Sequence, residues 1–171
     1  MAGDYRKERL VSAFTPDFPA YVDLVELDIW ITPPDATEIA RRRDLFHAAY
    51  HAALQAELTR VRGLHGVAIL YDCHSIRSHI PYLFDGTLAD FNIGTDSGRT
   101  CAGRIERATT GICAAADGYT TTLNGRFKGG WTTRHYGDPA AGLHAIQMEL
   151  AQSAYLTTEA APWTYDSARA A

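Results

Sequence analysis

The stretch "VAILYDCHSIRSHIP", residues 67–81, decides how this chain can fold. Its first five residues form a short apolar run without alternation, which is typical of a strand covered on both faces. The run then continues into an acid, an imidazole, a hydroxyl and a guanidinium, carried by Asp72, His74, Ser75 and Arg77. Ligands of parallel α/β sheets gather where strands end. The stretch therefore predicts either a capped strand end or the edge of an active site.

A helix is predicted directly before this strand. Between Asp35 and Gly63, apolar side chains recur at helical spacing. Asp35 and Glu38 form the N-cap and capping-box pattern, and Gly63 is the predicted stop. A helix followed by a buried strand favours an α/β layer architecture with parallel pairing.

The remaining sequence predicts short elements between long polar loops. Loops are predicted at 81–98 and 125–139, where Gly, Asp and Asn are frequent, and loops of this length are usually functional or disordered. The other predicted elements are a short strand at 22–31, a helix at 99–116, a strand at 119–125, a strand from 142 to about 150, and a cap with one helical turn at 164–171.

The length of the chain favours a single domain, and we expect that domain in the cytoplasm. Its 171 residues are 46% hydrophobic and carry a net charge of −4. No apolar stretch is long enough to cross a bilayer, and the first residues lack the pattern of a secretory signal. Cys73, Cys101 and Cys113 fit neither a disulfide framework nor a metal clip, so we expect reduced thiols.

Four groups of residues are candidates for a functional site. Asp72 and His74 are two apart and would face the same side of a continuous strand. His74 is either a metal ligand or an acid–base group oriented by Asp72. Alternatively, it is a partly buried imidazole with its hydrogen bonds satisfied, and Asp72 caps the following turn. Glu149 lies within an apolar run and is either an exposed carboxylate on an edge strand or a buried general base. His47 and His51 have a chelating spacing, but packing or surface placement is favoured because the HExxH glutamate is missing.

The fourth group is the loop "NGRFKGGWTTRHYG", residues 124–137, which contains cations among glycines and aromatics. It could be a solvated hairpin tip. It could also be a clamp, in which glycines let the backbone approach a ligand and guanidinium groups hold carboxylates in forked geometry. A nucleic-acid patch is disfavoured because the chain is acidic overall.

Three segments together resemble the N-formylglutamate amidohydrolases, which hydrolyse N-formyl-L-glutamate to formate and L-glutamate in histidine degradation. They are "YDCHSIRSHIPYLFDGTLADFNIGT", "LNGRFKGGWTTRHYG" and "GLHAIQMELAQ". The resemblance implies a mixed α/β sheet with flanking helices, of the zinc-carboxypeptidase and phosphorylase/hydrolase-like type. It covers residues 34–171 as the C-terminal portion of the family domain, with residues 1–33 unplaced.

The resemblance also implies roles for individual residues. His74 would be a Zn²⁺ ligand, Asp72 would orient it, and Glu149 would be the general base. The residues that would hold the small-molecule substrate, an N-formyl dicarboxylate, are Arg77, Asn92, Arg126, Lys128 and Arg134. No nucleic acid or membrane partner is expected.

This chain departs from the family at its N-terminal side, where members carry their first zinc ligands in a Pro-His-Ala-Gly type turn. No histidine precedes His47, whereas a zinc site normally needs three protein ligands. We therefore expect a fragment with an incomplete zinc site, which would be inactive alone. The alternatives are a non-catalytic module that binds a dicarboxylate or a partner, and an amidohydrolase for another N-acyl amino acid.

Overall fold

The structure is a computed structural model that describes residues 34–81 and 83–170. The chain divides into two compact units, with the boundary after Ala68, and each is described by itself. The strand predicted at 22–31 lies outside the described residues.

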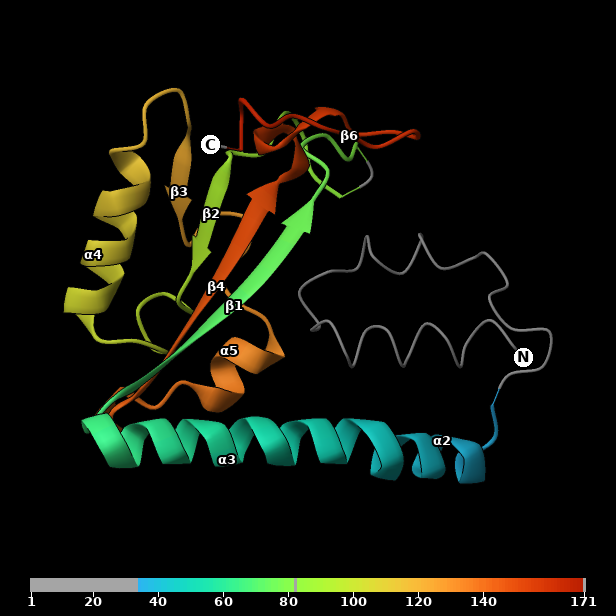
Figure 1. The fold of residues 1–171 in the computed structure, drawn as a ribbon, viewed down its shortest axis with the longest axis vertical. Coiled ribbons are helices and arrows are strands. Elements are labelled where there is room, and N and C mark those ends of the chain that lie inside the picture. The colour runs from blue at the N-terminus through green and yellow to red at the C-terminus, as the bar shows by residue number, and fades with distance from the viewer. Residues whose placement is uncertain (1–33, 82, 171) are drawn as a thin grey trace. The chain divides into compact units, whose positions relative to one another are not determined.

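One long helical segment forms the described part of the first unit (Figure 1). It consists of α2 (Ala36–Arg42), the π-helical turn η3 (Arg43–His47) and α3 (Ala48–His65). The Asp35 carboxylate accepts a hydrogen bond from the Glu38 N–H at 2.8 Å, which confirms the predicted N-cap. None of the described helices is long and apolar enough to cross a membrane.

The predicted helix stop at Gly63 is wrong. Gly63 lies within α3, and the helix ends at Gly66, which has the left-handed φ of 74°. A glycine ends a helix where the chain turns through positive φ, and the sequence offers two glycines three residues apart without showing which one makes that turn.

The second unit is built on a four-stranded sheet with the order β1-β4-β2-β3. Strand β2 pairs antiparallel with β4 and parallel with β3, and the arrows of β1 and β4 point the same way in Figure 1. The sheet is therefore mixed, as the family resemblance implies, and it includes the parallel pairing that the helix–strand pattern favours. The strands are β1 (Ala68–Ile76), β2 (Phe91–Gly94), β3 (Thr121–Leu123) and β4 (Leu143–Ala151).

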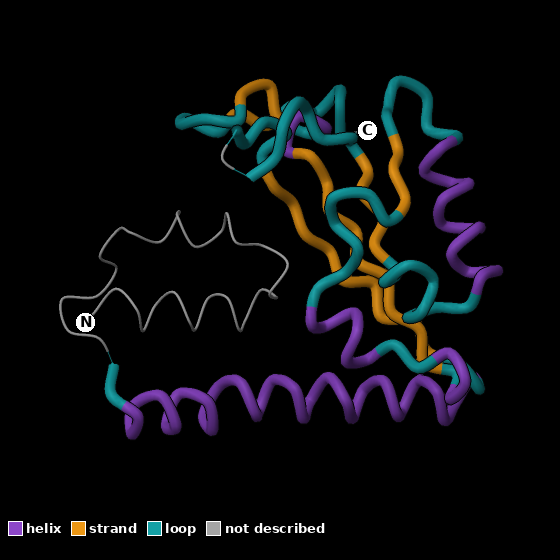
Figure 2. Tube along the Cα trace, turned by 180° about the vertical axis from the view of Figure 1, so that it is seen from behind, coloured by secondary structure: helices purple, strands orange, loops and turns teal. Residues whose placement is uncertain are grey.

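The connections between these strands contain further short elements, and their loops lie at both ends of the strands (Figure 2). The predicted helix at 99–116 and the predicted strands at 119–125 and 142–150 are confirmed by α4, β3 and β4. The connecting elements are α4 (Gly103–Ala114), α5 (Trp131–Tyr136), the 3-10 turns η4 (Pro139–Ala141) and η5 (Gln152–Ala154), and the hairpin strands β5 (Leu156–Thr158) and β6 (Thr164–Tyr165).

Two predicted loops contain regular structure, and one predicted helical turn begins with a strand. The loop predicted at 81–98 contains β2, and the loop predicted at 125–139 contains α5. The helical turn predicted at 164–171 starts instead with β6, after which the Asp166 carboxylate accepts hydrogen bonds from two main-chain N–H groups. These elements are so short that tertiary contacts, and not local periodicity, decide them.

The apolar face of the sheet forms the core of the second unit. Along β4, the side chains of Ile146 and Met148 pack on this face with Ile93 of β2. Helix α4 covers the same face through Ile105 and Cys113. Because strand residues alternate between faces, Gln147 and Glu149 of β4 must point to the opposite side of the sheet.

Strand β1 differs from its prediction in length and in burial. It continues through Asp72 and His74 to Ile76, so the polar residues lie inside the strand and not after it. The prediction that both faces are covered is wrong, because Ile69 is 51% and Tyr71 46% exposed. The reason is its place at one edge of the sheet, where alternate side chains of the described residues remain open to solvent.

Gly94 at the end of β2 allows a close contact between two backbones. A Cβ at this position would lie 2.6 Å from the Gly129 nitrogen and 2.7 Å from the Lys128 carbonyl carbon. The Asp96 N–H donates to the Lys128 carbonyl oxygen at 2.5 Å nearby. The glycine-rich loop, defined here as residues 124–130, therefore packs directly on the sheet.

We expect Gly94→Ala to destabilise the protein by about 1–3 kcal/mol, because a backbone would have to move to admit the methyl group. Gly111→Ala is the matched control: Gly111 lies inside α4 with open space around it, and alanine there should stabilise by about 0.5–1 kcal/mol. Urea unfolding midpoints measure both. Equal midpoints for the two variants would contradict the close contact.

Candidate functional site

The polar face of the sheet carries the candidate site. Gln147 and Glu149 project from β4 on this side, and α5 begins beside them. The Gly130 N–H, at the N-cap of α5, donates to Gln147 Oε1 at 2.7 Å. Gln147 Nε2 in turn donates to Glu149 Oε2 at 3.2 Å. A chain of hydrogen bonds therefore links the glycine-rich loop to the Glu149 carboxylate.

Asp72 and His74 form a pair on β1. His74 Nε2 lies 3.1 Å from Asp72 Oδ1, so the two side chains face the same side of the strand, as their spacing predicts. The His74 side chain is 48% exposed. A carboxylate on Nε2 fixes the ring orientation and leaves Nδ1 as the nitrogen that can bind a ligand.

Glu149 is a buried carboxyl group, 7% exposed. Burial raises its pKa, while the nearby His74 and the hydrogen bond from Gln147 act in the opposite direction, and Asp72 adds to the increase. The structure thus brings His74, Asp72 and Glu149 within electrostatic range of one another. Glu149 is not the exposed carboxylate of an edge strand, because β4 lies between β1 and β2.

We expect Glu149→Gln to stabilise the metal-free protein at neutral pH. The folded-state pKa of Glu149 lies above its ordinary value of 4.5, so the folded state keeps a proton that the unfolded state has lost. Stability therefore falls as pH rises from about 4.5 through the raised pKa. Urea midpoints measured with a chelator present should favour the variant near pH 7 and converge near pH 4. A constant difference at every pH would contradict the raised pKa.

The predicted substrate-binding cations do not form one cluster around Glu149 in the described contacts. Arg134 Nη1 donates to the Gly129 carbonyl at 2.7 Å, and an Arg126 Nη2–H donates to the Leu83 carbonyl. Arg77 is exposed just beyond the end of β1.

Asp96 is a neighbour of these cations that the sequence did not reveal. Its pKa is lowered chiefly by a hydrogen bond from Arg99, and also by the charges of Arg134 and Lys128. Asp96 is therefore a carboxylate within electrostatic range of both Lys128 and Arg134. The signal was weak in the sequence, because Asp96 precedes Lys128 by 32 positions.

Asn92 lies beside Glu149 across the β2–β4 pair and is 1% exposed. Its Nδ2 donates to the main-chain oxygens of Ala89, at 2.7 Å, and Glu149, at 3.0 Å. Its Oδ1 is buried without a hydrogen-bond partner. The Nδ2 group of this amide is thus bound to the backbone, while its Oδ1 is an acceptor without a hydrogen bond.

The described residues do not complete a zinc site. They contain no group of three His, Cys, Asp or Glu side chains arranged to hold a metal ion, whereas zinc usually takes three protein ligands and a water. The orientation of His74 by Asp72 fits a single ligand position. The rings of His47 and His51 lie with their centroids 4.2 Å apart and their planes tilted by 55° on the helix of the first unit.

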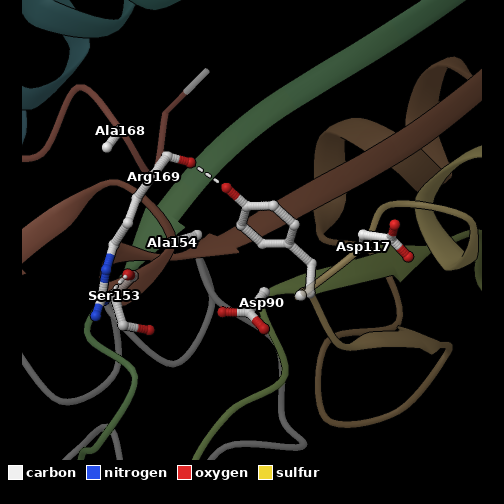
Figure 3. Close-up of a pocket in the computed structure, with 8 residues that line it drawn as sticks. Asp90, Asp117, Ser153, Ala154, Ala168 and Arg169 are labelled. Atoms are coloured by element: carbon white, nitrogen blue, oxygen red, sulfur yellow. Dashed lines mark hydrogen bonds between the residues drawn. The ribbon is translucent and has the colours of Figure 1, made fainter.

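A separate hollow of about 400 Å³ opens near the end of β4 (Figure 3). It is lined by Asp90, Asp117 and Arg169 among others, and a Tyr119 O–H donates to the Arg169 carbonyl across it. Asp90 already accepts hydrogen bonds from the N–H and hydroxyl of Thr120. None of the predicted site residues lines this hollow.

The second unit is a mixed α/β domain with titratable residues gathered near the carboxyl ends of neighbouring strands. The N-formylglutamate amidohydrolase family profile matches residues 12–156, and the chain belongs to this family. The crystal structure of an N-formylglutamate amidohydrolase from Ralstonia eutropha JMP134 shares the fold, with a TM-score of 0.65 and 24% identity over 78% of this chain and 49% of that one.

Two curated relatives are more similar in sequence. An N-formylglutamate deformylase from Pseudomonas putida is 52% identical and one from Pseudomonas aeruginosa is 48% identical, each over 132 residues. The matches cover 77% of this chain and 49% of each relative. The chain therefore spans about half the length of these relatives. The division into residues 1–33 and 34–171 stays a prediction.

Proposed function

We propose that this chain carries the general base of a zinc-dependent N-formylglutamate deformylase, which hydrolyses N-formyl-L-glutamate to formate and L-glutamate. The observation that carries the proposal is the buried Glu149 carboxyl beside the Asp72–His74 pair on one face of the sheet. Membership of the amidohydrolase family and the names of the two Pseudomonas relatives support the substrate.

Glu149 has the environment that a general base requires. Gln147 binds Oε2, so we assign the proton transfer to Oε1. Glu149 takes a proton from the attacking water while the oxygen of that water bonds to the formyl carbon. When the C–N bond breaks, Glu149 returns that proton to the departing amine nitrogen, which leaves formate and L-glutamate. A raised pKa suits a group that must both accept and release a proton.

His74 is the residue that we propose as the chain's own zinc ligand, through Nδ1. When bound, the metal would polarise the formyl oxygen and make water more acidic. The further ligands would come from outside the described residues, because a complete donor set is missing within them.

Lys128 and Arg134 are the cations that we propose for the substrate carboxylates. The charges of both residues help to lower the pKa of the Asp96 carboxylate, so both already act on an anionic group in this structure. Arg77, beyond β1, and Arg126, in the same loop as Lys128, are proposed as secondary contacts to the carboxylates. Asn92 Oδ1 is an acceptor and is proposed instead as a contact for the substrate N–H. Guanidinium and ammonium groups together suit a substrate with two carboxylates.

The test is formate release, measured with Zn²⁺ present, from the chain alone and from a chimera. The chimera joins this chain to the part of the Pseudomonas putida relative that the alignment leaves uncovered. We expect the chimera to release formate from N-formyl-L-glutamate and to act poorly on the N-acetyl and N-succinyl analogues. Preference for an analogue would assign another N-acyl substrate. A folded chimera that binds zinc and hydrolyses none of them would contradict the proposal.

A further inference from the structure

Gln147 is buried, 7% exposed, and uses both ends of its side-chain amide. Its Oε1 accepts the Gly130 N–H at 2.7 Å, and its Nε2 donates to Glu149 Oε2 at 3.2 Å. A buried amide that is satisfied at both ends has one preferred orientation, because rotating it by 180° would set its NH₂ against the Gly130 N–H. The Gly130 contact therefore fixes which end faces Glu149.

We propose that Gln147 is a positioning residue that couples the glycine-rich loop to the general base. The inference rests on the proposed function, in which Glu149 is that base and Lys128 in the loop binds substrate. Gln147 holds Oε2 of Glu149 and so directs Oε1 to the attacking water. Through Gly130, it also fixes the start of α5, which carries Arg134.

The neighbouring contacts make this coupling rigid. The loop backbone is pressed against Gly94 of β2, and Arg134 Nη1 donates to the Gly129 carbonyl at 2.7 Å. On the other side, Asn92 Nδ2 donates to the main-chain oxygen of Glu149 at 3.0 Å. Gln147 is thus the side chain that joins two segments, each already held in place, across the polar face of the sheet.

Two substitutions separate the two bonds of Gln147. Gln147→Met keeps the length and loses both bonds. Gln147→Glu keeps an acceptor for the Gly130 N–H but replaces the donor to Glu149 with a second carboxylate. Gln55→Met, at an exposed position on α3, is the control.

The first readout is amide exchange measured by NMR on the whole chain, which needs no activity. We expect Gln147→Met to speed exchange of the Gly130 amide proton about tenfold or more, and Gln147→Glu to leave it protected. Unchanged Gly130 exchange in Gln147→Met would overturn the coupling, even if the chain releases no formate.

The second readout is the kinetics of the chimera described above. We expect Gln147→Glu to lower kcat about tenfold or more with KM little changed, and Gln147→Met to lower kcat and raise KM together. A merely structural role would lower the amount of folded protein without separating the two constants. If wild type hydrolyses the substrate and both variants keep wild-type kcat, the proposal is wrong. An inactive wild type would instead count against the proposed function.

Discussion

Glu149→Gln is expected to lower the kcat for N-formyl-L-glutamate by about 10²–10⁴-fold. Glutamine has nearly the same shape as glutamate, and its amide oxygen can still accept the hydrogen bond from Gln147 that Glu149 accepts. What it cannot do is take a proton from water. The loss should therefore appear in kcat, with KM and zinc content close to those of the unchanged protein.

Glu57→Gln is the matched control for this loss, because Glu57 is an exposed helical glutamate that pairs with Arg60. It should keep full activity. The urea midpoint of Glu149→Gln should be at least that of wild type at neutral pH, since a buried carboxylate has been removed. A stable, zinc-loaded Glu149→Gln protein with more than about one tenth of wild-type kcat would be incompatible with a base role.

His74→Ala should abolish tight zinc binding and, with it, formate release. Asp72 pairs with the His74 imidazole in this structure, and loss of one of the usual three ligands leaves too few donors. Zinc bound per chimera molecule is measured after dialysis against a competing chelator. His65→Ala, at an exposed position in the last turn of α3, serves as control and should retain zinc.

Asp72→Asn tests the orientation of His74 separately. The amide can still contact His74 Nε2 but carries no charge, so zinc affinity should fall by about 10–100-fold, without complete loss. Full zinc retention in His74→Ala would show that His74 is not a ligand. Equal losses in His74→Ala and Asp72→Asn would show that the acid does more than orient the ring.

Some features followed from residues close together in sequence. The Asp35 cap needs only Glu38, three positions away, and the Asp72–His74 pair needs only a continuous strand. The alternation on β4 likewise places Glu149 and Met148 on opposite faces of the sheet. The same rule could have identified Gln147 as a side chain on the face that carries Glu149.

Features that depend on distant partners were missed or misplaced. Strand β2 lies in a Gly- and Asp-rich segment and owes its form to pairing with β3 and β4. The exposed faces of Ile69 and Tyr71 follow from the edge position of β1, which no local pattern shows. The charges of Lys128 and Arg134 act on Asp96 because the glycine-rich loop packs onto the end of β2, where the Asp96 N–H donates to the Lys128 carbonyl.

The sequence by itself determined which chemical groups β1 and β4 carry, because strand period and residue identity are local properties. It also determined the resemblance of the chain to the amidohydrolase family. Only the tertiary structure decided that Glu149 is buried, that its carboxylate is held by Gln147, and that Gln147 also holds Gly130, 17 residues away. Burial and long-range hydrogen bonds depend on strand order, and strand order is set by the packing of the whole sheet.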